Sequence, residues 1–222
     1  MAAPKQFKDA PARAALEDVP PISAVEIRGR QQVARDKAAA VGLDGLLVVG
    51  RSFYDRPGDL AYLTGHFPPF PTTVFSDGNR GMGHAMLLLP VVGEPVLLTD
   101  ARKHRPDLVV VDDVRAAGDL GLGLIELLKE TYLEDANLGL VGDDILPAAL
   151  DRQLLHDLPG LTLDPEPSIV AGMRAVKSPG ELDLLRRAAL CADAALMPAS
   201  TMIRRGFLTE RDVCAEAIAV VM

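Results

Sequence analysis

A helix start at Ser178 constrains the fold of this chain more than any other stretch of its sequence. Ser178 is a favourable N-cap residue, Pro179 suits the first helical turn, and Glu181, three residues after the cap, completes a capping box. Apolar residues then recur at helical spacing: Leu182, Leu185, Ala189, Ala192 and Leu196. We therefore predict a long helix that begins at Ser178 and carries one apolar stripe.

A second helix start follows at Thr209, with Asp212 three residues further on. Its apolar residues are Val213, Ala217, Val220 and Val221. This stripe runs to Met222 without a Gly or a polar last turn that would end the helix. Since an apolar helix face needs further protein to cover it, we expect the chain to be the front part of a longer protein.

Predicted strands and helices alternate in the residues before Ser178. The strands are Leu43–Gly50, His84–Pro90, Pro95–Thr99, Leu108–Val111, Asn137–Val141 and Leu161–Leu163. The first helix is Val25–Val41, closed by Gly42, and the second is a brief helix that Asp59 caps, that runs through Leu63 and that Gly65 ends. The third is Asp119–Tyr132, with Asp119 as its N-cap and Tyr132 on its apolar face, and the fourth is Leu146–His156. The second and third strands form a hairpin through Val92–Glu94. This order predicts an α/β domain whose mixed β-sheet is flanked by helices.

The segment His66–Gly83 is the least regular part of the predicted domain. Its prolines and glycines cannot sustain a helix or a central strand. Within it, Phe67–Phe75 combines aromatic residues with rigid prolines, which suggests a contact surface. Gly78–Gly83 superficially resembles a phosphate-binding loop, but it leads into a strand and not into a helix, so turn chemistry is the better interpretation.

Composition excludes several function classes. The net charge of −8 disfavours a nucleic-acid partner held by phosphate contacts. No apolar run approaches the roughly 20 residues that a membrane span needs, so we expect no membrane contact. Residues 1–24 form an N-terminal arm without the apolar centre of a signal peptide. Cys191 and Cys214 have no metal or redox spacing, which fits a reducing, cytoplasmic setting.

The residues themselves assign no catalytic group and no metal ligand. Three histidines, His66, His84 and His104, border predicted loops and could meet in space, but none has the spacing of a metal motif. No serine has a Gly-x-Ser-x-Gly context. The carboxylates of the C-terminal part, Asp183, Asp193 and Asp212, are better interpreted as solvated charges on helix faces.

Three segments carry a family resemblance. Arg174–Ala189 reads Arg-Ala-Val-Lys-Ser-Pro-Gly-Glu-Leu-Asp-Leu-Leu-Arg-Arg-Ala-Ala, Gly206–Val213 reads Gly-Phe-Leu-Thr-Glu-Arg-Asp-Val, and Asp59–Gly65 reads Asp-Leu-Ala-Tyr-Leu-Thr-Gly. They resemble the interdomain hinge, the Gly-x-Thr-Glu element and the Asn-x-x-Tyr-Leu-Thr-Gly-Phe segment of the creatinase/prolidase/aminopeptidase P family (M24 metallopeptidases). The resemblance extends from about Glu26 onward.

The chain departs from the family pattern at connectors. Arg205 stands where a Pro is usual, and one extra residue separates Gly206 from Thr209. Asp59 replaces the usual Asn, and His66 is inserted before Phe67.

The resemblance implies a domain organisation. Residues 25–172 would form the creatinase-type N-terminal α/β domain, which is ribonuclease H-like, and residues 173–222 the hinge and first helices of a truncated pita-bread catalytic domain. In the family that catalytic domain holds two divalent metal ions, of Mn, Co or Zn type, on two Asp, one His and two Glu. Those positions lie beyond Met222, so we expect no cofactor and no activity in this chain alone.

The resemblance also implies a role for the N-terminal domain. In several members this region of one subunit reaches toward the active site of its dimer mate, so Arg56, Tyr62, His66 and Arg80 become candidates for shaping substrate access. The alternative is that Tyr62 and Leu63 pack their helix on the sheet while Arg56 and Arg80 lie in solvent.

Three functional interpretations follow. The first is the non-catalytic N-terminal portion of an Xaa-Pro peptidase-like metallohydrolase, a cytoplasmic homodimer that acts on proline-containing peptides. The second is a stand-alone α/β module for assembly or small-molecule binding. The third is the N-terminal part of a creatinase-like amidinohydrolase.

Overall fold

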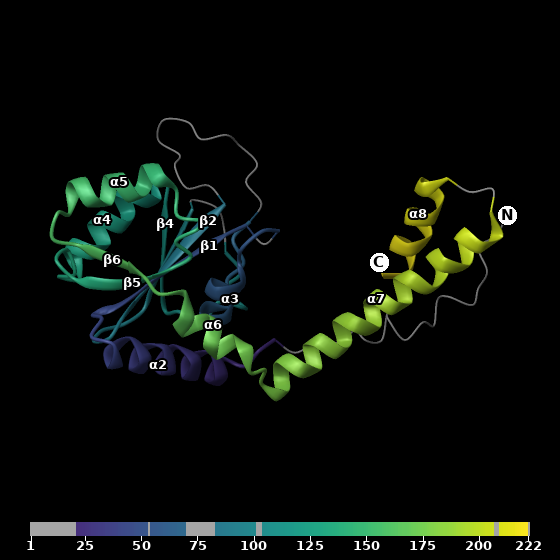
Figure 1. Cartoon of the computed structure of the whole chain (residues 1–222), viewed down its shortest axis with the longest axis horizontal. Helices are drawn as coiled ribbons and strands as arrows, with labels where there is room; N and C mark the ends of the chain where they lie inside the picture. The colour runs from purple at the N-terminus through teal and green to yellow at the C-terminus, as the bar shows by residue number, and fades with distance from the viewer. Residues whose placement is uncertain (1–20, 53, 70–82, 101–103, 207–208, 222) are drawn as a thin grey trace. The chain divides into compact units, whose positions relative to one another are not determined.

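The computed structural model describes residues 21–52, 54–69, 83–100, 104–206 and 209–221 (Figure 1). Most of the predicted N-terminal arm, most of the Phe67–Phe75 loop, and Arg80 lie outside these residues. Ser23–Val176 form one compact unit, and the described residues from Lys177 onward belong to another.

A six-stranded mixed sheet forms the centre of the Ser23–Val176 unit, in the order β4-β3-β2-β1-β5-β6. The strands are β1 Gly45–Arg51, β2 His84–Pro90, β3 Val96–Asp100, β4 Asp113–Ala117, β5 Asn137–Val141 and β6 Thr162–Pro165. β2 pairs antiparallel with both β1 and β3, while β1–β5, β3–β4 and β5–β6 are parallel. The predicted mixed sheet and its β2–β3 hairpin are confirmed.

Helices cover both faces of this sheet (Figure 1). They are α2 Ala24–Ala40, α3 Gly58–Thr64, α4 Leu120–Glu130, α5 Ala148–Asp157 and α6 Pro167–Ala175. Side chains alternate along the strands, so Leu47 and Val49 of β1 join the core under α4 and α5. Leu46 and Val48 join the core under α2, α3 and α6. Because both faces are covered, the central strands are apolar without interruption.

Of the two N-caps predicted for helices of this unit, one is confirmed and one is wrong. Asp119 caps α4 through the Gly121 and Leu122 amides, as predicted. Ser23, which was not predicted as a cap, accepts a hydrogen bond from the Glu26 amide of α2 (3.2 Å). Asp59 does not cap α3, because Pro57 occupies the N-cap position and Asp59 lies inside the first turn.

The predicted strand Leu108–Val111 is also wrong. This segment bonds to helices instead of a neighbouring strand: the Val110 amide donates to the Thr64 carbonyl (2.8 Å), and the Val110 carbonyl accepts from Gln31 Nε2 (2.9 Å). The strand forms further on, as the half-buried edge strand β4.

Two further differences concern helices of this unit. α4 ends at Glu130, and Tyr132 lies beyond it with a positive φ of 58° and 89% exposure, not on the apolar face. α6 is not predicted from the sequence, although Pro167 at its first turn and the buried Ile169 and Val170 are suitable signals.

The second unit contains α7 Pro179–Arg205 and α8 Glu210–Val221, which pack on each other. The capping box is present, because the Glu181 amide donates to Ser178 Oγ (3.2 Å) and the Ser178 amide to Glu181 Oε2 (2.9 Å). The predicted apolar stripe of α7 stays largely exposed: Leu182 40%, Leu185 54%, Leu196 65%. None of the helices in the described ranges has the length and hydropathy of a membrane span.

Candidate functional site

Buried polar residues gather at one edge of the sheet, where β1 ends, β2 begins and β3 ends. The register places Arg51 opposite His84, and Ala85 opposite Thr99. The buried polar residues of this edge and the adjoining end of α3 are Ser52, Thr64, His66, His84, Thr99 and Asp100. Burying a polar group without a hydrogen-bond partner costs free energy, so the partners of these side chains matter for the stability of this edge.

Backbone bonds close this edge. Asp100 Oδ2 accepts from the Gly83 amide (2.9 Å), while the Gly83 carbonyl accepts from the Ser52 amide (2.6 Å). Ser52 is buried at a positive φ of 33°, and its carbonyl accepts from the Asp55 amide (3.0 Å). The contacts of Ser52 therefore belong to a tight turn and show no arrangement for nucleophilic attack.

His66 is held neutral at this edge. It is only 4% exposed, and its amide donates to Thr64 Oγ1 (3.0 Å). Burial, followed by the charge of His104, lowers the pKa of His66 from 6.5 to about 4, and Asp100 opposes the shift. Its Nε2 is buried without a hydrogen-bond partner among the described residues.

The three histidines of the sequence hypothesis do not form a metal site in the part of the chain that the structure describes. His66 and His104 are near enough for their charges to interact. However, no group of three or more His, Cys, Asp or Glu in the described ranges could hold a metal ion.

The remaining candidates for substrate access occupy different settings. Arg56 Nη1 pairs with Asp144 Oδ2 (2.7 Å), and both side chains are exposed to solvent. Tyr62 donates its hydroxyl to the Met173 carbonyl (3.3 Å), and the Arg30 guanidinium lies 4.0 Å from the centroid of its ring. Arg80 lies outside the described residues. These contacts join Tyr62 of α3 to α6 and α2.

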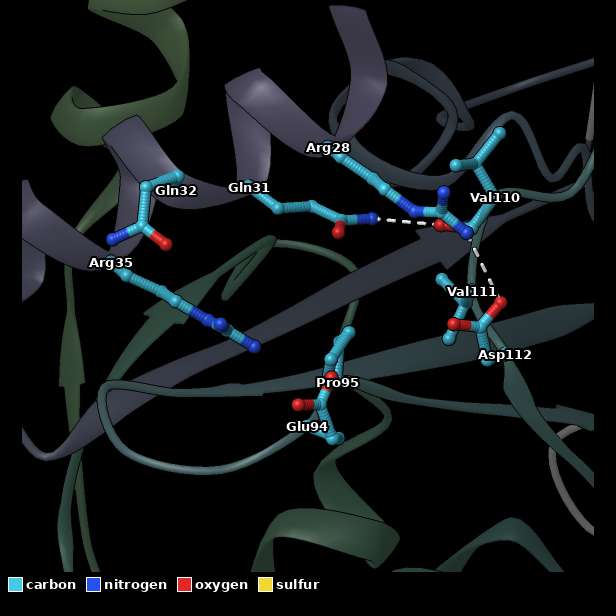
Figure 2. Close-up of a pocket in the computed structure, with 9 residues that line it drawn as sticks. All are labelled: Arg28, Gln31, Gln32, Arg35, Glu94, Pro95, Val110, Val111 and Asp112. Atoms are coloured by element: carbon cyan, nitrogen blue, oxygen red, sulfur yellow. Dashed lines mark hydrogen bonds and ion pairs between the residues drawn. The ribbon is translucent and has the colours of Figure 1, made fainter. Parts of the chain in front are cut away.

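A polar hollow between α2, the β2–β3 turn and the segment before β4 is not predicted from the sequence (Figure 2). Nine residues line it: Arg28, Gln31, Gln32, Arg35, Glu94, Pro95, Val110, Val111 and Asp112. Its volume is about 170 Å³. The four residues from α2 follow the i, i+3, i+4, i+7 spacing of one helix face, and that spacing of polar residues is the signal that could have revealed it.

The hollow carries both signs of charge. Arg28 Nη2 reaches Asp112 Oδ1 (3.3 Å) at one end, and Arg35 Nη2 donates to the Gly93 carbonyl (2.9 Å) at the other. Glu94 lies below Arg35 in the view of Figure 2. At about 170 Å³ the hollow is smaller than the roughly 300–1,000 Å³ of typical ligand pockets, and its lining is more polar than theirs.

Comparison with known proteins identifies the fold. No protein-family model and no curated protein matches the sequence. Among solved structures, the prolidase from Pyrococcus horikoshii OT3 superposes with a TM-score of 0.63 at 15% identity, over 87% of this chain and 48% of that chain. The Xaa-Pro dipeptidase from Bacillus anthracis gives a TM-score of 0.61 at 21% identity, over 90% and 49%. The dipeptidase PepE from Mycobacterium ulcerans gives 0.58 at 20% identity, over 91% and 50%.

The likeness confirms the fold that the resemblance implied. The chain spans about half the length of each of these three proteins.

Proposed function

We propose that the chain is the N-terminal, non-catalytic portion of a metallopeptidase of the creatinase/prolidase/aminopeptidase P family that acts on Xaa-Pro peptides. The observation that carries this proposal is the shared fold with prolidase and Xaa-Pro dipeptidase structures over about half of their length. The hinge-like segment Arg174–Ala189 supports it independently. Fold alone does not fix a substrate, so the proline-containing peptide rests on both observations together.

The described residues do not fit the two metal ions of such an enzyme. They contain no cluster of ligands that could hold a metal, so we assign the metal sites and the hydrolytic chemistry to the part of the parent protein that this chain lacks. The proposed contribution of the described residues is architectural.

The exposed apolar side chains of the second unit support a covering partner. On α7, Leu185, Leu196 and Met197 are 54%, 65% and 69% exposed, and Ile218 on α8 is 53% exposed. Large apolar side chains that stay exposed on both packed helices are typical of a surface that further protein covers. We propose that α7 and α8 are the start of a pita-bread domain and that the remaining half of the proposed enzyme covers this surface.

Exposed aromatic residues beside the polar sheet edge support a subunit contact at this edge. Tyr54 and Phe67, which flank this edge, are 79% and 55% exposed. Exposed aromatic residues are enriched at protein interfaces. We therefore propose that the parent enzyme is a cytoplasmic homodimer. Arg56 and His66 would shape substrate access in it.

Two measurements test the proposal. We expect the gene product in its source cell to exceed the 23.6 kDa of this chain by a further domain, of roughly 150–250 residues. We also expect this chain alone to show no Mn²⁺-dependent hydrolysis of Ala-Pro, while the full-length product hydrolyses it. A native product of 23.6 kDa would contradict the proposal, as would a full-length protein inactive on Xaa-Pro peptides.

A further inference from the structure

Two segments that are far apart in the sequence meet where α6 ends. Arg174 Nη1, in the last turn of α6, pairs with Asp59 Oδ1 of α3 at 2.6 Å. One residue earlier, the Met173 carbonyl accepts the hydroxyl of Tyr62 at 3.3 Å. Both contacts lie inside the Ser23–Val176 unit.

Tyr62 also contacts α2, through Arg30. The Arg30 guanidinium of α2 lies 4.0 Å from the centroid of its ring, and Arg30 Nη1 donates to the Tyr62 carbonyl (3.2 Å). Arg30 is buried and also pairs with Glu26. Cation–π and charge-assisted contacts of this kind are stronger when they are shielded from water. Tyr62 therefore offers a rigid support to the end of α6.

The last turn of α6 depends on these contacts more than on burial. Ile169 and Val170, in the first turns, are buried in the core, whereas Ala175 and Val176 at the end are exposed. Met173 is only partly buried. A turn with little apolar area in the core is the part of a helix that opens first.

We propose that Asp59, Tyr62 and Arg174 form a latch that holds the last turn of α6 on α3 and fixes the point from which the chain leaves the unit at Val176. When the latch opens, residues 173–176 detach from α3 while the core stays folded. The carboxylate of Asp59 replaces the Asn usual in segments of this type, so the pairing with Arg174 carries charge. The latch does not depend on the proposed function.

Hydrogen exchange of the full chain, followed by mass spectrometry, tests the latch. We expect D59N, R174Q and Y62F each to speed exchange in residues 173–176 by about two- to fivefold, because a partly exposed ion pair or hydrogen bond contributes on the order of 1 kcal/mol or less. The double variant D59N/R174Q should exchange no faster than the faster single variant, since both changes remove one contact. R28Q breaks the exposed pair with Asp112 and should leave α6 unchanged.

The variant G58A tests the same contact without changing any charge. A Cβ at Gly58 would lie 2.7 Å from Arg174 Nη2, and the guanidinium is the movable end of a flexible side chain. G58A should therefore displace Arg174 and speed exchange at residues 173–176, while the better helix propensity of Ala leaves the urea midpoint unchanged or higher. Wild-type exchange at these residues in D59N, R174Q and G58A would overturn the proposal, as would additive effects in the double variant.

Discussion

At the scale of single residues, His66 is the side chain whose protonation the fold changes most clearly. It is buried beside His104, and its pKa falls from 6.5 to about 4. The unfolded chain therefore binds a proton between these two values that the folded chain does not. The contribution of His66 to the free energy of unfolding should be full above pH 6.5 and should fall as the pH drops toward 4. The total loss from this residue should be up to about 3 kcal/mol.

Urea unfolding at pH 7.5 and pH 4.5 measures this effect. We expect H66Q to lose less stability than the wild type between the two values, because its side chain does not titrate. H156Q is the matched control, since His156 is exposed and bonds only to the neighbouring Asp157 among the described residues. An equal loss in the wild type and H66Q would contradict the assignment of the effect to His66.

Several residue roles depend on partners distant in sequence, which limits their prediction. Gln31 looks like a surface residue of α2, yet its amide is buried and donates to the carbonyls of Leu63 (2.8 Å) and Val110 (2.9 Å). Tyr62 likewise contacts Met173, 111 residues away. The sequence placed His66 beside a loop, but the burial that sets its pKa arises only when the strand ends assemble.

At the scale of elements, the end of α3 depends on a glycine. Gly65 has a φ of +73°, and a Cβ there would lie 2.1 Å from the Leu108 carbonyl oxygen. G65A combines backbone strain with a backbone clash, so we expect a loss of about 2–4 kcal/mol in urea unfolding.

Gly29 provides the control for this substitution. It lies exposed within α2 with no atom within 4 Å of a built Cβ, so G29A should raise stability by up to about 1 kcal/mol. A neutral G65A would show that the segment around Leu108 yields easily, contrary to this expectation.

Elements with strong local signals were predicted well. The buried strands β1, β2 and β5 follow from apolar runs, and α2 follows from its apolar spacing and the closing Gly42. The helices α4 and α7 follow from their N-cap residues. The failures have a shared cause. Leu108–Val111 has the composition of a strand, but its backbone groups bond to Gln31 and Thr64, and Asp59 pairs across space with Arg174 instead of capping its own helix.

At the scale of the whole molecule, both hydrophobic cores lie within Ser23–Val176. A segment that contains its complete core should fold by itself. We therefore expect the excised segment 23–176 to unfold cooperatively in urea, with a midpoint close to that of the same transition in the full chain. Circular dichroism and tyrosine fluorescence should report coincident transitions, and a gradual, non-cooperative loss of signal would contradict this expectation.

The functional assignment was only partly predictable at this scale. The motifs around Asp59 and Arg174 pointed to the family whose fold the structural comparisons support, and the structure brings those two motifs into contact. The hollow of Figure 2 was missed because its walls come from α2, the β2–β3 turn and the segment before β4, which only the tertiary fold brings together.

The central position of β1 has a consequence for synthesis on the ribosome. β1 lies between β2, which follows soon after it, and β5, whose residues 137–141 come almost one hundred positions later. During translation one edge of β1 therefore stays open until β5 has left the exit tunnel, and the sheet cannot close before then. An unpaired, apolar edge strand is prone to pair with other chains. The nascent chain is thus most vulnerable to aggregation while the residues between β2 and β5 are being made.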